Sequence, residues 1–391
     1  MKRLPRKCVH CRQHRELPQG AYCRDSNVLS ARCTRNVARA TIRNMSLILL
    51  APALLSAAVP EFARQMVRLP NLEALFAAGK IGTADDAAEE WLCAQLGCPT
   101  PDGAPIAALR LASETAVRVD AEQGYWLCAD PIATSIGIDS VRIDRVITDL
   151  TQPEATALTQ SLNDCFSPDG LRFVAPSASR WYVQCDAPQS IVTTPLWRAI
   201  GGSMLIQFPT GNAAPAWRSR LNEAQMLLHS HSVNTARAHH GLLPVGSLWW
   251  WGGGSWPALV PAKIDVVVGG PRWIGSACAA SRVDFRPLCA DASALFQTGT
   301  RNTLIVLDDK WEQSALTPDS LVRWEGEWFG ALRAALDSGA LDQATLVFPW
   351  GSGTLRVDLQ PPRRSRWQRW FALGGTAAPP PLAETLRAYL Q

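Results

Sequence analysis

The residues best suited to chemistry lie in one stretch, 221–254, which reads LNEAQMLLHSHSVNTARAHHGLLPVGSLWWWGGG. Asn234 and Arg237 are three residues apart, so they share a face of a helix, and His231 precedes them. An arginine guanidinium can bind a phosphate or carboxylate group through two parallel hydrogen bonds. These three side chains are therefore candidate contacts for a small anionic ligand. The alternative is that they hydrogen-bond the loop that follows.

The second half of the stretch combines aromatic rings with glycines. On a strand, Trp249 and Trp251 point to one side and Trp250 to the other, where their rings could stack on a sugar or base or pack in the core. The run Gly252, Gly253 and Gly254 then predicts a turn, whose backbone N–H groups could approach a ligand or adopt positive φ. We expect Trp249, Trp251 and the three glycines to belong to the ligand site.

Candidate metal ligands are few. Asp308 and Asp309 follow a predicted strand, and α/β sites gather at the carboxyl ends of strands, but a helix cap or solvated loop explains them equally. Asp130 has the same two interpretations. After Met45 the histidines are confined to His229, His231, His239 and His240. On one helix His229 and His240 would stand ~16 Å apart, which does not furnish two clustered metal sites. We therefore expect no cofactor. If the protein is an active enzyme, we expect it to require Mn²⁺ or Mg²⁺.

Alternating strands and helices surround this stretch. Leu221, Ala224, Leu227 and Leu228 recur at helical spacing, and Gly241 stops the helix. Helices are predicted at 69–78, 84–96, 113–122, 153–166 with Thr151 as N-cap, and 319–338. Strands are predicted at 47–50, 141–147, 171–174, 180–184, 247–251, 264–268 and 303–307, with a hairpin of 345–348 and 354–359. This order predicts an α/β fold with a mixed, largely parallel sheet flanked by helices.

Residues 1–44 differ from the rest of the chain. They contain 11 Lys and Arg against 2 Asp and Glu, a net charge of +9, whereas the remainder contains 27 against 32, a net charge of −5. Cys8 and Cys11 have the spacing of half a zinc site, but Cys23 and Cys33 are ten residues apart. We expect this Cys-containing leader to be disordered or not part of the native protein. Residues 45–391 then form the α/β domain.

The apolar segment SLILLAPALLSAAV, residues 46–59, resembles the hydrophobic part of a signal peptide. The basic region before it is too long for that role, and the segment is too short to span a bilayer as a helix. We therefore predict a buried first strand at 47–50. Scattered cysteines, 11 in number, indicate reduced thiols and a cytoplasmic protein. No other apolar run is long enough to span a membrane, so we expect no membrane contact. The acidic body makes nucleic-acid binding an unlikely function outside the leader.

The central motif resembles a known family. NE-x-QMLLH-x-H-x-VN-x-x-R followed by LPVGSLWWWGGG is similar to the bacterial RpfE-type regulatory proteins. More distantly, H-x-VN-x-x-R before a tryptophan- and glycine-rich element is similar to cofactor-independent phosphoglycerate mutases, which belong to the alkaline phosphatase superfamily. The resemblance covers about residues 45–391 and implies a phosphomutase-like core. Matching flanking pieces are Leu162-Asn163, Asp169-Gly170-Leu171, Ala175-Pro176, Arg180-Trp181-Tyr182 and Trp328-Phe329.

The resemblance implies a function that the residues only partly support. The mutase superfamily places an Asp after the first strand and Asp and His metal ligands in later loops, whereas this chain has Leu50-Ala51-Pro52 and no Asp-His pair. We therefore predict a catalytically degenerate, mutase-like regulatory protein that binds a small anionic ligand or a protein partner. The alternative is an active metal-dependent phosphoglycerate mutase or phosphotransferase with a rearranged metal site.

Overall fold

The central strands lie in a mixed sheet of the computed structural model. The structure describes residues 46–52, 54–55, 68–98, 103–114, 124–137, 141–289, 292, 295, 302–307, 318–350, 353–361 and 379–389. All of them belong to one compact unit, Asn44–Gln391. The predicted leader with its four cysteines, most of the predicted helix 113–122, and the metal candidates Asp308 and Asp309 lie outside the described residues.

Seven described strands form this sheet, in the order β2-β12-β11-β1-β10-β8-β9. Strands β11, β1, β10, β8 and β9 run parallel, and β12 and β2 add an antiparallel edge. The prediction of a mixed, largely parallel sheet is therefore confirmed. The strands are β1 (Ser46–Leu50), β2 (Lys80–Ala84), β8 (Val266–Gly269), β9 (Asp284–Arg286), β10 (Thr303–Val306), β11 (Gln343–Trp350) and β12 (Gly353–Leu359).

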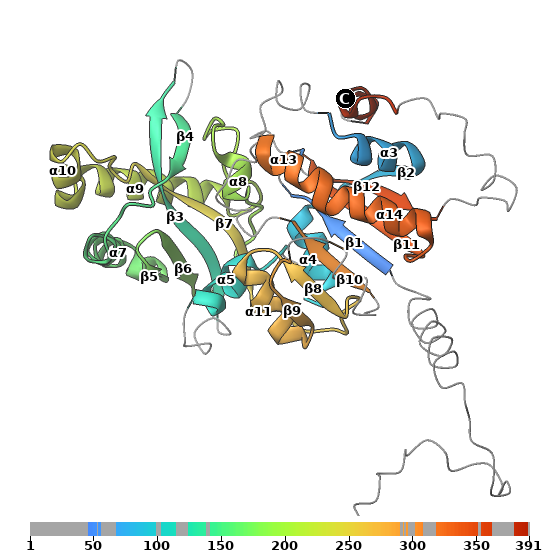
Figure 1. The fold of residues 1–391 in the computed structure, drawn as a ribbon. Helices are drawn as coiled ribbons and strands as arrows, with labels where there is room; N and C mark the ends of the chain where they lie inside the picture. The colour runs from blue at the N-terminus through green and yellow to red at the C-terminus, as the bar shows by residue number, and fades with distance from the viewer. Residues whose placement is uncertain are drawn as a thin grey trace, which may run out of the picture. The chain divides into compact units, whose positions relative to one another are not determined.

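Helices cover both faces of this sheet (Figure 1). Side chains alternate along each strand, so Leu47 and Leu49 of β1 enter one core cluster and Leu50 enters another. The first cluster is closed by α3 (Pro70–Ala78), α13 (Pro318–Trp324), the π-helical turn Glu325–Gly330, α14 (Ala331–Ser338) and α15 (Leu382–Arg387). The second is closed by α4 (Ala88–Gln95), α5 (Ile106–Glu114) and α11 (Arg272–Ser281).

A second sheet, which the sequence did not predict as a separate unit, is antiparallel. Its described strands are β3 (Tyr125–Ile136), β4 (Val141–Val146), β5 (Leu171–Ser177), β6 (Arg180–Cys185) and β7 (Ser247–Ser255). Strands β6 and β7 both pair with the first half of β3, so they flank its opposite edges, and β4 pairs with the second half. The helices here are α7 (Gln152–Phe166), the 3₁₀ turn Ser167–Asp169, α8 (Leu196–Ala199), α9 (Ala214–Ser230) and α10 (Ser232–His239).

Several predicted elements are confirmed. The signal-like segment begins with a central strand whose Leu47, Leu49 and Leu50 side chains are 0% exposed. Thr151 caps α7 in a reciprocal capping box with Glu154. The helix predicted at 319–338 buries an apolar face that includes Leu321, Trp328 and Leu332, although a π-helical turn interrupts the α-helix. None of the helices in the described ranges is long and apolar enough to cross a membrane.

Three predicted boundaries are wrong. The helix expected to continue from residue 221 to Gly241 is two helices, because it breaks at His231. The glycines after Trp251 do not end the strand, since β7 continues to Ser255. The helix predicted to begin at residue 113 begins instead at Ile106, as α5, while residues 115–122 lie outside the described residues. In the first case the His231 side chain caps the second helix, which divides the predicted helix in two. In the second case pairing with β3 keeps the glycines in the strand.

Candidate functional site

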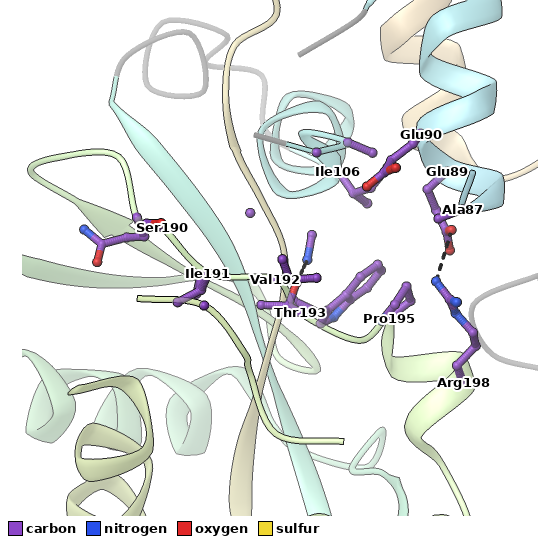
Figure 2. Close-up of a pocket in the computed structure, with 17 residues that line it drawn as sticks. Ala87, Glu89, Glu90, Ile106, Ser190, Ile191, Val192, Thr193, Pro195 and Arg198 are labelled. Carbon is purple, nitrogen blue, oxygen red and sulfur yellow. Dashed lines mark hydrogen bonds and ion pairs between the residues drawn. The ribbon is translucent and has the colours of Figure 1, made fainter. Parts of the chain in front are cut away.

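A cavity of about 360 Å³ lies where β7, the segment 189–195 and the first turns of α4 and α5 meet (Figure 2). Ile106 is the first residue of α5, and Ala87 is the N-cap of α4. Thr193 comes from the loop that follows β6, and Gly252 from β7. The cavity therefore joins residues from four distant parts of the sequence.

The glycines of β7 shape one wall of this cavity. Two β7 residues, Gly252 and Gly253, oppose a single residue of β3, so they form a β-bulge rather than a turn. Gly252 has φ of +64°, and a Cβ atom on it would lie 2.9 Å from the Ile106 Cβ. Its N–H donates to the Thr193 hydroxyl at 3.2 Å. A Cβ on Gly254 would lie 2.8 Å from Pro105. The glycine run therefore lets the start of α5 approach β7.

Among the described residues, two carboxylates and one guanidinium line the cavity. Glu89 is buried, and its Oε1 accepts a hydrogen bond from the Trp197 indole at 2.8 Å. Its Oε2 lies 3.7 Å from Nη2 of Arg198. Glu90 is exposed at the cavity. Partial burial, followed by the neighbouring Glu89 carboxylate, raises the pKa of Glu90, and Arg198 opposes this shift. The lining thus carries more negative than positive charge.

Trp251 also lines the cavity, and a buried ion pair fixes its indole. The Trp251 Nε1 donates to Asp130 Oδ2 at 2.8 Å, and Asp130 is 1% exposed. The Arg110 guanidinium donates to both Asp130 oxygens, at 2.8 and 3.2 Å. It lies 5.4 Å from the centroid of the Trp251 ring. Asp130 therefore positions Trp251 and holds Arg110, and this ion pair accounts for a carboxylate that the sequence left as a possible metal ligand.

His231 forms the junction between α9 and α10. It ends the first helix and caps the second, because its Nδ1 accepts from the Val233 N–H at 3.1 Å. Its Nε2 lies 3.1 Å from the Ser161 hydroxyl. A nitrogen that accepts carries no proton, so Nε2 carries the proton of the neutral ring and donates to Ser161. Burial lowers the pKa of His231.

Asn234 and Arg237 bind the loop before β7. The Asn234 side-chain amide donates to the carbonyls of Leu228 and Val245, at 2.8 and 2.9 Å. Arg237 is 1% exposed and donates to the Leu243 carbonyl at 2.9 Å. Its guanidinium pairs with Asp149 at 2.6 Å and with Glu154 at 3.3 Å. Both side chains thus use their polar groups within the protein, as the alternative interpretation of the sequence requires.

The structure brings together only part of the predicted site. Trp251, Gly252 and Gly253 line the cavity, and Gly254 follows them on the same strand. Trp249 is 1% exposed and donates to the Thr194 carbonyl at 2.8 Å. His231, Asn234 and Arg237 do not line the cavity. Their role as ligand contacts stays a prediction.

Sequence reasoning missed the charged part of the cavity. Glu89, Glu90 and Arg198 lie about 110 residues apart in two segments without a motif, and Ile106 carries no chemical signal. Consecutive acidic residues in the first turn of a helix are ordinary partners of the helix dipole. Only the tertiary structure therefore marks these residues as a site.

The strand end at which the mutase resemblance implies a metal-binding carboxylate is apolar. Leu50 and Ala51 are 0% exposed, and Leu54 and Leu55 are buried beside them. These side chains do not fit a metal ion, because hard cations require oxygen or nitrogen ligands. Within the described part of the chain, no group of three or more His, Cys, Asp or Glu side chains is arranged to hold a metal. Burial raises the pKa of the Cys278 thiol to about 12.

Comparison with known proteins gives fold similarity only. No protein-family model matches the chain, and no curated protein does. The chain is similar to the cofactor-independent phosphoglycerate mutase from Thermoplasma acidophilum, at 16% identity over 82% of this chain and 90% of that chain, with a TM-score of 0.38. It is also similar to the PH0037 protein from Pyrococcus horikoshii, at 10% identity over 81% of this chain and 87% of that chain, with a TM-score of 0.41.

Proposed function

We propose that this protein is a catalytically degenerate, phosphomutase-like regulatory protein that binds a small ligand in the cavity beside Gly252 and Gly253. The observation that carries the proposal is the cavity itself. Its volume of about 360 Å³ is in the range of small-molecule sites. Its wall combines apolar surface from Ile106 and Trp251 with the charged groups of Glu89 and Arg198. Such a combination of a shaped apolar wall and a few polar groups is typical of a ligand site.

The degenerate character is supported by the apolar end of β1. A phosphomutase must neutralise the transferred phosphoryl group and activate a hydroxyl nucleophile, which metal ions accomplish in such enzymes. Leu50 and Ala51 occupy the place where the resemblance implies the carboxylate. The remaining candidates, Asp308 and Asp309, lie outside the described residues. A regulatory role needs only binding, so it does not require this carboxylate.

A cavity-blocking variant tests the ligand site. The full chain is screened by thermal unfolding against a diverse set of small metabolites, with Ser190→Trp as the blocking variant. Ser190 is exposed and lines the cavity, so the larger side chain fills space without disturbing the core. Ser230→Trp, at an exposed position of α9 away from the cavity, is the matched control. Compounds that stabilise the wild type and Ser230→Trp, but not Ser190→Trp, support the proposal. Equal stabilisation of all three proteins, or of none, contradicts it.

A turnover assay tests the degenerate assignment. The full chain is incubated with 3-phosphoglycerate, with and without Mn²⁺, after circular dichroism has established that it is folded. We expect no turnover above the uncatalysed rate. Metal-dependent turnover at enzyme-like rates, lost in Asp308→Ala, would replace this assignment with an active phosphotransferase that uses a rearranged ligand set.

A further inference from the structure

Glu90 is the more exposed of the two carboxylates in the described lining of the cavity. No hydrogen bond or ion pair joins it to another described residue. In Figure 2 the Glu89 and Arg198 side chains point toward one another and are joined by a dashed line, whereas Glu90 reaches toward Ile106. Arg198, the one guanidinium in the described part of the lining, is therefore paired with Glu89, and its charge acts on Glu90 without a hydrogen bond or ion pair.

Glu89 offers a second acceptor. The residue is 5% exposed, and its Oε2 is buried and accepts no hydrogen bond among the described residues. The 3.7 Å separation from Arg198 Nη2 is longer than a hydrogen bond, so this oxygen lacks a hydrogen-bond donor among the described residues. A buried charged oxygen without a hydrogen bond is costly, and a ligand that donates to it would remove that cost.

The charges of the lining select among ligand classes. A simple anion would approach two carboxylates and a guanidinium that is already paired, so it would be repelled. A divalent cation would meet only these two carboxylates, since no group of three or more His, Cys, Asp or Glu side chains among the described residues is arranged to hold a metal. A protonated amine fits better, because it is a compact positive charge with up to three N–H donors. Apolar surface from Ile106, Val192 and the Trp251 ring is available for an attached carbon chain.

We propose that the ligand of this cavity carries a cationic amino group, which binds the Glu90 carboxylate and donates a hydrogen bond to Glu89 Oε2. This inference rests on the proposed ligand-binding function and narrows it, since it replaces the anionic ligand predicted from the sequence with a cationic one. The carbon chain of the ligand lies against Ile106 and Trp251, and its volume is limited by the cavity of about 360 Å³.

Calorimetric titration of the full chain with n-butylammonium and ethanolammonium tests this assignment, with n-butanol and inorganic phosphate as probes that lack the cationic group. Glu90→Gln keeps the shape of the side chain and removes its charge, and it should fold normally because Glu90 forms no hydrogen bond or ion pair with another described residue. Glu223→Gln, at an exposed position of α9, is the matched control for the lost charge. We expect the amines to bind, and Glu90→Gln to weaken binding by about tenfold or more, since the bond is charge-assisted.

Three outcomes overturn the inference. These are equal amine affinity of Glu90→Gln and the wild type, binding of n-butanol as tight as that of n-butylammonium, and binding of phosphate without binding of amines. Each of them leaves the proposed function standing if the metabolite screen still finds compounds that Ser190→Trp excludes. Absence of any binding, by amines and metabolites alike, removes both proposals.

Discussion

Asn234 hydrogen-bonds both backbone polar groups of Val245: its Oδ1 accepts from the Val245 N–H at 2.8 Å, and its Nδ2 donates to the Val245 carbonyl at 2.9 Å. Asn234 lies on α10, and Val245 lies two residues before β7. The side-chain amide thus satisfies both backbone hydrogen-bonding groups of this residue, as a neighbouring strand would. One residue therefore fixes the entry of the chain into the strand that carries Trp249, Trp251 and the cavity glycines.

Asn234→Ala should destabilise the protein by about 2 to 3 kcal/mol, because the N–H and carbonyl of Val245 lose their partners in a buried place, and the Leu228 carbonyl keeps only the His231 N–H. Urea unfolding, followed by tryptophan fluorescence, measures this loss. Thr235→Ala, at the exposed neighbouring position, is the control and should change stability by less than about 0.5 kcal/mol. Similar free energies of unfolding for Asn234→Ala and Thr235→Ala would show that the hydrogen bonds between Asn234 and Val245 do not stabilise the protein.

Arg237→Ala should lower stability by about 2 to 4 kcal/mol, since Asp149, Glu154 and the Leu243 carbonyl lose a buried partner. Asp149 is 48% exposed, so solvent compensates part of the loss. The same unfolding measurement checks the effect, with the exposed Arg323→Ala as control. If Arg237→Ala folds as stably as the wild type but binds ligand less well, Arg237 is a ligand contact, as the sequence motif predicted.

Arg110→Met should destabilise the protein by about 3 to 5 kcal/mol, because it leaves the Asp130 carboxylate buried without its counter-charge. The double variant Arg110→Met and Asp130→Leu removes both charges and should recover much of the loss. Equilibrium unfolding of the two variants distinguishes these effects. A single variant that is less stable by under about 1 kcal/mol would show that the ion pair contributes little.

Gly252→Ala should lower the free energy of unfolding by about 1 to 3 kcal/mol, because the Gly252 φ of +64° disfavours any residue with a Cβ atom. The new methyl group would also press on Ile106 Cβ, 2.9 Å away, and narrow the cavity. Gly326→Ala is the matched control: its Cβ would meet no atom within 4 Å. Because Gly326 lies in a helical turn, this control should be neutral or stabilising by up to about 1 kcal/mol. Equal thermal stability of the two variants would contradict the prediction.

Stability should fall as the pH drops below about 6.5, in part through His231. Burial lowers the pKa of His231 in the folded protein, so the unfolded chain binds the proton at a higher pH than the folded protein does. Protonation therefore stabilises the unfolded state relative to the folded state. The contribution is present above the unfolded pKa of 6.5 and is lost as the pH falls through the lower folded pKa. His231→Asn keeps a capping side chain that does not titrate. Thermal unfolding from pH 5 to 8 should show a weaker pH dependence in this variant, and an unchanged dependence would exclude His231 as the cause.

The sequence determined the alternation of elements and the identity of the central strand. Leu47–Leu50 is a strand because a short apolar run fits a buried position of a parallel sheet, whatever its likeness to a signal peptide. Thr151 and Glu154 predict the start of α7, since the capping box is formed by residues only three positions apart. Local signals of this kind act within one turn, so they are readable without the fold.

The tertiary structure decided everything that depends on distant partners. It turned the glycine run into a bulge, because α5 must approach β7 at Gly252 and Gly254. It committed Asn234 and Arg237 to the loop at 243–245, where buried polar groups must find partners. It also brought Glu90 to a cavity wall across from β7. Residue type gives a side chain its chemistry, but only packing determines whether its partner is the protein or a ligand.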